Sequence, residues 1–184
     1  MDPITKELSE EHKHILTMVD ALVRECEALE QGAELDRDFF KKAVDFIRHY
    51  ADRFHHAKEE DILFEELGKP GVRMHCDPRQ QMLHEHDLGR KYVKGMDEGT
   101  VSGDKLKVVE NARRYSRLLL DHIYKEDNIL YPMAEQTLGE ETSRDIAARF
   151  RKVNAAFGGA QEKYLALARE LAERRAKGAK EPEG

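Results

Sequence analysis

The sequence predicts an all-α protein, and three observations support this fold class. Apolar residues recur at three- and four-residue steps, which is the period of an amphipathic helix. Charged residues make up 37% of the chain and aromatic residues only 7%, with no Trp, so we expect an aliphatic core. Alternating runs of Val, Thr and Tyr, which would indicate strands, are missing.

The chain is long enough for one domain. Its 184 residues, of which 40% are hydrophobic, can bury one sizeable core, which we expect to span residues 1–176. Residues 177–184 consist mostly of Lys, Glu, Pro and Gly, a composition typical of a disordered tail.

Charge and cysteine usage exclude several classes of partner and compartment. The net charge of -6 comes from interspersed acids and bases, which argues against a nucleic-acid partner. Neither a basic segment followed by an apolar run nor a stretch of about eighteen apolar residues occurs, so we expect no signal peptide and no membrane partner. Cys26 and Cys76 form no CxxC motif, which fits a reducing compartment. We therefore expect a soluble, cytoplasmic protein.

The first predicted helix covers residues 5–31. Its apolar stripe includes His12, which lies about 40° from Leu8, whereas His14 points about 120° away from it. Only His12 therefore faces the core. Cys26 lies on the same stripe, and we expect it to be buried as an apolar side chain.

The second predicted helix covers residues 37–67, and a straight helical register separates its two adjacent His residues. Counted from Val44, His55 deviates by about 20° and Glu59 by about 60°. His56 deviates by about 120° and Glu60 by about 160°, so His55 and Glu59 are the inward pair. The role of His56 remains open: from the edge of the stripe it is either an extra ligand or a partner of the ligands.

The third predicted helix, over residues 79–98, repeats this selection of one His from a close pair. His86 shares the apolar face of Met82, whereas His84 lies about 200° from Met82, on the opposite side. His86 therefore points inward.

The fourth predicted helix covers residues 104–136 and contains a second His with an acid four residues later. His122 and Glu126 both lie within about 60° of Leu119 on the apolar side. Pro132 falls inside this pattern and predicts a kink or an early end of the helix.

The fifth predicted helix covers residues 140–174 and has no His. The pair Gly158-Gly159 in its middle predicts a bend or close packing against another helix. The sequence leaves two roles open for this helix: it either caps the bundle or forms the contact of a homodimer.

The inward polar residues form a constellation that indicates a metal centre. Four successive helices each contribute one inward His, and two of them add a Glu one turn later. Buried unpaired carboxylates cost several kcal/mol, and two close together would drive a proton onto one of them, a difficulty that a metal centre removes. Imidazole and carboxylate without thiolate fit iron, manganese or zinc, and two carboxylates that can bridge favour a two-metal site. The predicted ligands are His12, His55, Glu59, His86, His122 and Glu126.

These residues resemble the pattern of the hemerythrin-like, or HHE cation-binding, family along residues 10–132. The resemblance implies an up-down-up-down four-helix bundle with two Fe ions in an oxo- or hydroxo-bridged di-iron centre, bridging carboxylates at Glu59 and Glu126, and the four His as terminal ligands. It is carried by four motifs in the same order: Glu11-His12, His55-His56-x-x-Glu59-Glu60, Glu85-His86 and His122-x-x-x-Glu126-Asp127-x-x-Leu130-Tyr131-Pro132.

One departure from the oxygen-carrying members of that family bears on function. Those carriers have an HxxxH motif on the third helix, but position 82, four before His86, is Met here. Four His would leave about two coordination positions open, unless His56, Glu60 or Asp127 is an extra ligand. A more open site suits redox chemistry on a small molecule, or the handling of labile iron.

We therefore expect a cytoplasmic non-haem di-iron protein that binds or reacts with a small oxidant, namely O2, NO or peroxide. One alternative is an oxygen or iron storage or sensing module without turnover. Another is a structural zinc site in an interaction module, which is less favoured because zinc prefers four ligands and six residues point inward. Candidate partners that orient the His rings are Glu60, Glu85, Tyr92 and Tyr124.

Overall fold

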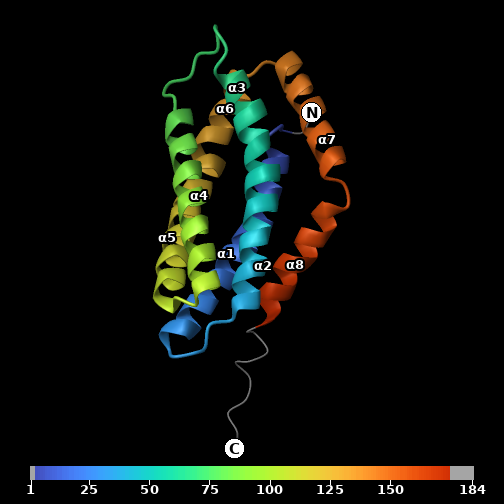
Figure 1. Cartoon of the computed structure of the whole chain (residues 1–184). Helices are drawn as coiled ribbons and strands as arrows, with labels where there is room; N and C mark the ends of the chain where they lie inside the picture. The colour runs from blue at the N-terminus through green and yellow to red at the C-terminus, as the bar shows by residue number, and fades with distance from the viewer. Residues whose placement is uncertain (1–2, 175–184) are drawn as a thin grey trace, which may run out of the picture.

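The computed structural model describes residues 3–174, and all regular elements in this range are helices. Four long helices run alternately up and down and form a bundle, as predicted, and a further helical pair lies along one side (Figure 1). None of the helices described combines the length and apolar character that crossing a bilayer requires. In chain order, with π-helical segments named η, the bundle consists of α1 (Lys6–Glu30), α2 (Arg37–Phe46), η1 (Ile47–His56), η2 (Glu59–Leu63), α3 (Phe64–Leu67), α4 (Arg79–Ser102), α5 (Lys105–Lys125), η3 (Glu126–Leu130) and α6 (Tyr131–Thr137).

Short acidic residues and glycine set the ends of the bundle helices. Asp36 accepts a hydrogen bond from the backbone N–H three residues later (3.0 Å), and Asp104 does the same (3.0 Å), so each caps a helix N-terminus. α4 runs past its predicted end to Ser102, because Gly103, with φ of 78°, is the first residue in the left-handed conformation. The segment 177–184, predicted to be a tail, lies outside the described residues.

The second and fourth bundle helices are not regular α-helices. Each changes to π-helical hydrogen bonding, from N–H to the carbonyl five residues earlier, and such segments occur often at functional sites. One residue inserted into a turn rotates all that follows by about 100° relative to a straight α-helix. Of the two outcomes predicted for Pro132, an early end does not occur, since α6 continues to Thr137; the irregular segment η3 directly precedes α6.

The bundle core consists of two apolar layers separated by a polar layer. In α1, for example, Leu8 belongs to one layer and Ile15 to the other, with His12 between them. The same division occurs along the other three bundle helices, each at the position of the predicted ligands. The apolar layers therefore keep bulk water away from the polar layer on both sides.

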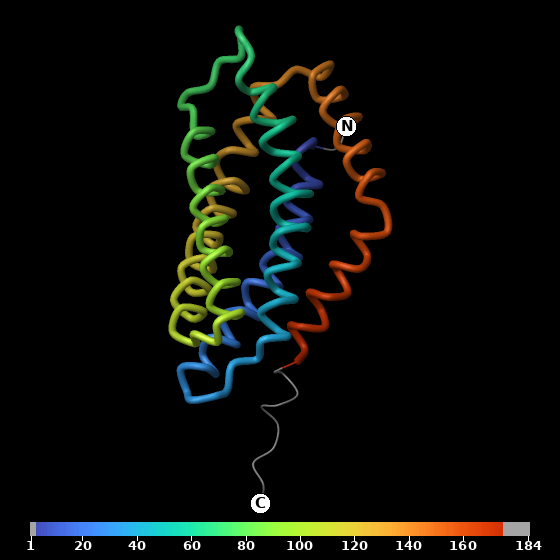
Figure 2. Tube along the Cα trace, in the orientation of Figure 1, coloured from blue at the N-terminus to red at the C-terminus, as the bar shows by residue number. Residues whose placement is uncertain are grey.

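The helical pair α7 (Glu140–Phe157) and α8 (Ala160–Arg174) covers one side of the bundle (Figure 2): α7 packs against η1 and η2, and α8 packs against α1 and α2. The predicted bend is confirmed, since Gly158 separates the two helices with φ of 53°. The expectation of an aliphatic core is wrong here. The bundle helix that this pair covers is buried on two sides and fills the space with rings: Phe39, Phe40, Phe46, Tyr50 and Phe54 are all buried, and Phe157 of α7 stacks on Phe54 at 4.2 Å.

Candidate metal centre

All six predicted ligands meet in the polar layer, and a seventh residue, His56, joins them. The side chains form two groups in which the possible ligand atoms all lie within 4.8 Å of one another. Glu59 belongs to both groups. All seven residues are buried. The first group is His12, His55, Glu59 and Glu126, and the second is His56, Glu59, His86 and His122.

The imidazoles face each other in pairs. His12 Nε2 lies 3.0 Å from His55 Nε2, and His86 Nε2 lies 2.9 Å from His122 Nε2. The ring of His56 stacks on that of His86, with centroids 3.7 Å apart and an interplanar angle of 11°. Each pair joins two different helices, so the four bundle helices converge at this layer.

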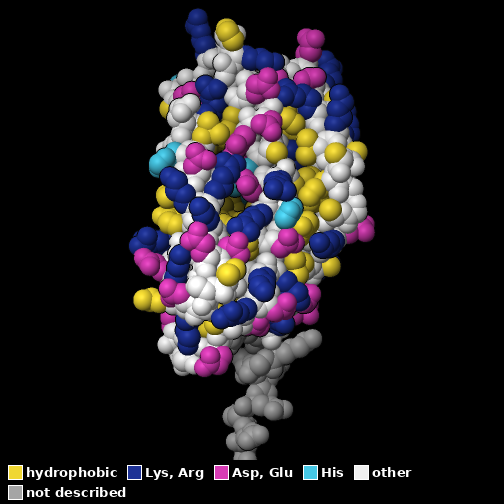
Figure 3. All heavy atoms as spheres, in the orientation of Figure 1, with side chains coloured by type: hydrophobic (Ala, Val, Ile, Leu, Met, Phe, Trp, Pro, Cys, Tyr) yellow, Lys and Arg dark blue, Asp and Glu magenta, His cyan; other side chains and the backbone are white. Residues whose placement is uncertain are grey.

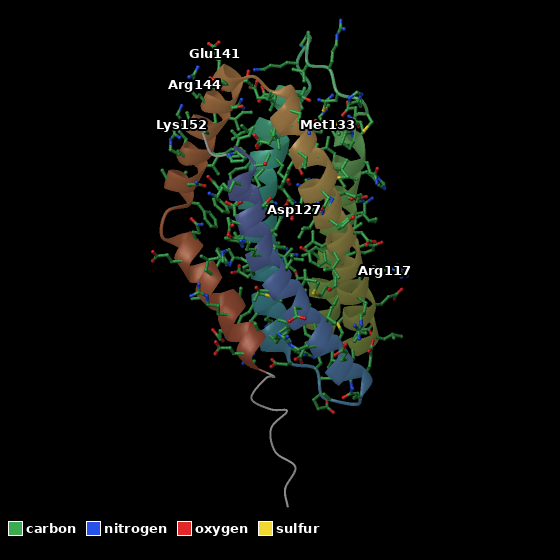
Figure 4. The ribbon with its side chains drawn as sticks, turned by 180° about the vertical axis from the view of Figure 1, so that it is seen from behind. Arg117, Asp127, Met133, Glu141, Arg144 and Lys152 are labelled. Carbon is green, nitrogen blue, oxygen red and sulfur yellow. The ribbon has the colours of Figure 1, made fainter. Side chains whose placement is uncertain are left out.

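Each of the five imidazoles has a carboxylate at its outer nitrogen. Carboxylates only accept hydrogen bonds, so each Nδ1–H donates, and in a neutral ring Nε2 then has its lone pair toward the centre. Figure 4 shows Asp127, the partner of His12, on the side of its helix that faces α1. The Nδ1–oxygen distances are 3.0 Å for His12–Asp127, 2.9 Å for His55–Glu11, 3.4 Å for His56–Asp52, 2.6 Å for His86–Glu60 and 2.8 Å for His122–Glu85.

This arrangement fits bound metal ions. In two neutral rings held this way, the paired Nε2 atoms would present lone pairs to each other at about 3 Å, and a cation between them removes that repulsion. Glu59 Oε2 and both carboxylate oxygens of Glu126 are buried without a hydrogen-bond partner. The two Glu126 oxygens lie 3.3 Å from His12 Nε2 and 3.0 Å from His122 Nε2, so this carboxylate reaches both groups.

The pKa values in the centre are strongly shifted. Burial opposes protonation of His12, but its hydrogen bond with Asp127 and the nearby charge of Glu126 raise its pKa to about 9. A similar balance, with Glu126 as the main partner, raises the pKa of His122 to about 10. Burial and the charge of Glu126 also raise the pKa of Glu59 well above its usual value. The cluster therefore holds protons in the absence of metal, and a metal ion must displace them on binding.

Tyr131 is a further side chain of the centre. Its Oη donates a hydrogen bond to Glu59 Oε1 (2.5 Å) and lies 3.3 Å from His12 Nε2, while its ring stacks on that of His12. The sequence pattern contained Tyr131 only as part of a motif and assigned it no role. Its position, five residues after Glu126 in a motif that repeats a His and an acid, is the signal that could have identified Tyr131.

Lys58 is a fully buried cation beside the centre, which sequence reasoning missed. Its ammonium donates to Glu11, to Glu7 (2.7 Å) and to Asn154 of α7 (3.1 Å), and it lies 4.1 Å from the centroid of the Phe54 ring. Glu11 in turn accepts from the predicted ligand His55, so this lysine balances the charge of an outer carboxylate.

The structure places the outer residues around the imidazole rings. Glu60 and Asp127 bind Nδ1 atoms and belong to neither ligand group, and Glu85 orients His122 as predicted. Tyr124 as an orienting partner is wrong, because its side chain is 65% exposed, and Tyr92 packs against the apolar core instead. His14 and His84 lie outside both groups, as predicted.

A cavity of about 250 Å³ reaches the second group from the surface. It lies between η1, α4 and α5, and the side chains of His56, His86 and His122 form part of its lining. No residue that belongs to the first group alone lines this cavity. The two halves of the centre therefore differ in access.

Comparison with known proteins gives one match. The sequence model described as the hemerythrin HHE cation binding domain matches residues 4–134, which contain the whole bundle up to α6 and exclude α7 and α8. No curated protein and no solved structure matches the chain.

Proposed function

Because the chain belongs to the hemerythrin HHE cation-binding family, we propose that its His and Glu cluster holds two iron ions and binds or reacts with O2, NO or peroxide. His12 and His55 would serve one ion, His56, His86 and His122 the other, and the two glutamates both. The observation that carries this proposal is the orientation of five imidazoles by five outer carboxylates around carboxylate oxygens that have no other partner.

The donor set favours iron over the zinc alternative. Zinc sites are closed with four ligands and often use thiolate, whereas this layer offers seven nitrogen and oxygen donors and neither cysteine is part of it. Imidazole and carboxylate ligands on facing helices of a bundle suit a pair of ions such as iron or manganese. Bound iron supplies the redox chemistry that these side chains alone lack.

The surrounding residues would orient the imidazole ligands, shield the centre from water and hold a proton beside it. The outer carboxylates fix each imidazole tautomer, and the two apolar layers exclude water from above and below. Burial and the charge of Glu59 raise the pKa of Tyr131 well above its usual value, so its Oη keeps its proton. Tyr131 therefore holds a proton next to the first group, where it donates a hydrogen bond to Glu59.

The decisive experiment begins with metal content. Elemental analysis and a Mössbauer spectrum of protein expressed in iron-supplemented medium should show bound iron. We expect Glu59→Ala and Glu126→Ala to lose most of this iron, because each removes a carboxylate that faces both groups, whereas His84→Ala, on an exposed residue, should keep it. Equal loss in all three variants would contradict the assignment.

The second step tests reactivity. Iron-loaded, reduced protein mixed anaerobically with O2, NO or peroxide should change its visible spectrum, and an unchanged spectrum with all three would refute this function. A storage or sensing module without turnover is the second candidate, favoured by the burial of all seven side chains. A stable, reversible oxygenated spectrum would support it, whereas repeated peroxide consumption would support an enzyme. We also propose a cytoplasmic location, since Cys26 and Cys76 are both free thiols.

A further inference from the structure

The cavity beside the second group is larger than a diatomic oxidant requires. Its volume is about 250 Å³, and it runs along the bundle from His122 to Tyr115, which are about 10 Å apart along α5. An apolar protein cavity of about 150 Å³ is enough to bind benzene, and drug-sized ligands occupy about 300–1,000 Å³. The space therefore suits a small organic molecule.

The inner wall of the cavity is apolar. Val93, Leu118 and Leu119 line it, and Gly89 leaves room beside the Tyr115 ring. Tyr115 is 3% exposed, and its Oη is buried without a hydrogen-bond partner among the described residues, so the wall consists of its ring and not of its hydroxyl. A ligand with an apolar body would fit against this wall.

The rim of the cavity contains three arginines and two acidic residues, Asp52 and Glu85. Arg48 and Arg90 are already paired, with Asp97 (2.8 Å) and with Asp52 (2.7 Å). Arg53 is exposed and forms no ion pair within the described part of the chain. Figure 3 shows a hollow on this face, with basic and acidic side chains around the opening. An anionic group on the ligand would complement the unpaired Arg53.

We propose that this cavity binds a small organic acid, with an apolar body against the inner wall and a carboxylate that complements the arginine rim. The acid occupies the open side of the second group, so it defines which molecules approach that half of the centre. The inference rests on the cavity and its lining and goes beyond the proposed reaction with an oxidant.

Isothermal titration of the protein as isolated, with its iron content measured on the same sample, tests this inference. Benzoate is the probe, and benzamide is its neutral counterpart of nearly the same shape. We expect benzoate to bind at least about fivefold more tightly than benzamide, because only benzoate carries the charge that the rim complements. Equal affinity of the two probes, or no binding of benzoate at millimolar concentration, would overturn the inference.

Three variants locate the bound probe. Gly89→Leu should weaken benzoate binding at least about tenfold by filling the cavity, whereas Gly89→Ala should retain it, because the added Cβ lies 3.6 Å from the Tyr115 ring, an ordinary contact. Tyr115→Phe should leave benzoate binding unchanged, because the hydroxyl it removes is buried and does not reach the cavity. Its free energy of unfolding should stay equal or rise, since the hydroxyl has no protein partner. Unchanged binding in Gly89→Leu would place the probe elsewhere.

The rim has its own matched pair. Arg53→Gln should weaken benzoate about two- to fivefold and leave benzamide unaffected. Arg117→Gln, on an exposed arginine at the outer edge of α5 (Figure 4), should change neither. Equal effects of both substitutions would overturn the role of the rim. If iron is present and benzoate does not bind, only this inference fails; if benzoate binds and iron is absent, only the proposed function fails.

Discussion

The Lys58→Met substitution should destabilise the protein far more than an ordinary lysine substitution. Met has a similar length and keeps the apolar contact with the Phe54 ring, so the main loss is the ammonium. Glu11, whose side chain is 5% exposed, then keeps its hydrogen bond from His55 but has no cation beside it. Removing one partner of a buried ion pair costs about 3–5 kcal/mol, because the other charge is left uncompensated.

Urea denaturation with the iron content held equal measures this loss. With an m-value of about 2 kcal/mol per molar urea, the midpoint should fall by about 1.5–2.5 M. Burial already raises the pKa of Glu11, and removal of Lys58 removes the main opposing charge. A raised carboxyl pKa in the folded state gives stability that is present at low pH and lost as the pH rises through that pKa. The deficit of the variant should therefore be larger at pH 8 than at pH 5.

Two controls define the outcome. Lys94→Met, at a lysine whose side chain is 75% exposed, should change stability by less than about 0.5 kcal/mol. The double variant Lys58→Met/Glu11→Gln should recover part of the loss, because it also removes the buried carboxylate that Lys58 balanced. A loss below about 1 kcal/mol for Lys58→Met, or additive losses in the double variant, would show that the buried charges are not coupled as described.

Three further predictions concern protonation and the tyrosine of the centre. Metal affinity should rise as the pH rises toward 9–10, because the metal displaces protons from His12 and His122, whose pKa values are about 9 and about 10; titration at several pH values measures this. At pH 8, iodoacetamide should alkylate the exposed Cys76 within minutes but Cys26 only on unfolding, since burial raises the pKa of Cys26 to about 12, and peptide mass spectrometry distinguishes the two. Tyr131→Phe should lower the free energy of unfolding by about 1.5–3 kcal/mol, the loss of one hydrogen bond to a buried carboxylate, while iron content is retained; a stability equal to wild type would argue against that bond.

Helical periodicity was sufficient to select most of the centre. In α1, α4 and α5 the angular positions of His12, His86 and His122 relative to apolar neighbours identified the inward residue, and the structure places all three in the ligand groups. These helices are regular α-helices up to the ligand, so a fixed rotation per residue describes them.

The same calculation left His56 open because its helix is not regular. η1 ends at His56 and η2 begins at Glu59, so π-helical turns precede and follow the pair of adjacent His residues. The wider turn lets neighbouring residues share the inner side, and His55 and His56 belong to different groups. A periodicity that assumes a straight α-helix places them about 100° apart, and nothing in composition marks where the turn widens.

Sequence reasoning recovered the outer carboxylates only in part. Glu60 and Glu85 were recognised because each lies next to a ligand in the chain, but Asp52 and Glu11 serve rings on the next turn or on another helix. Asp52 serves His56, whose own role the sequence left open, and the pair of Glu11 and His55 depends on how two helices face one another, which the spacing within one helix does not reveal. Lys58 was overlooked for the same reason, since its partners come from α1 and α7.

The helical pair beyond the matched domain has a consequence for how this chain is shortened. Asn154 of α7 bonds to Lys58, and Phe157 covers Phe54. A chain cut at residue 139 would keep every predicted ligand yet uncover aromatic rings and admit solvent to an ammonium one hydrogen bond away from Glu11. Such a fragment would be prone to aggregation, and the dielectric around one imidazole of the centre would increase without any change in the residues that face the metal.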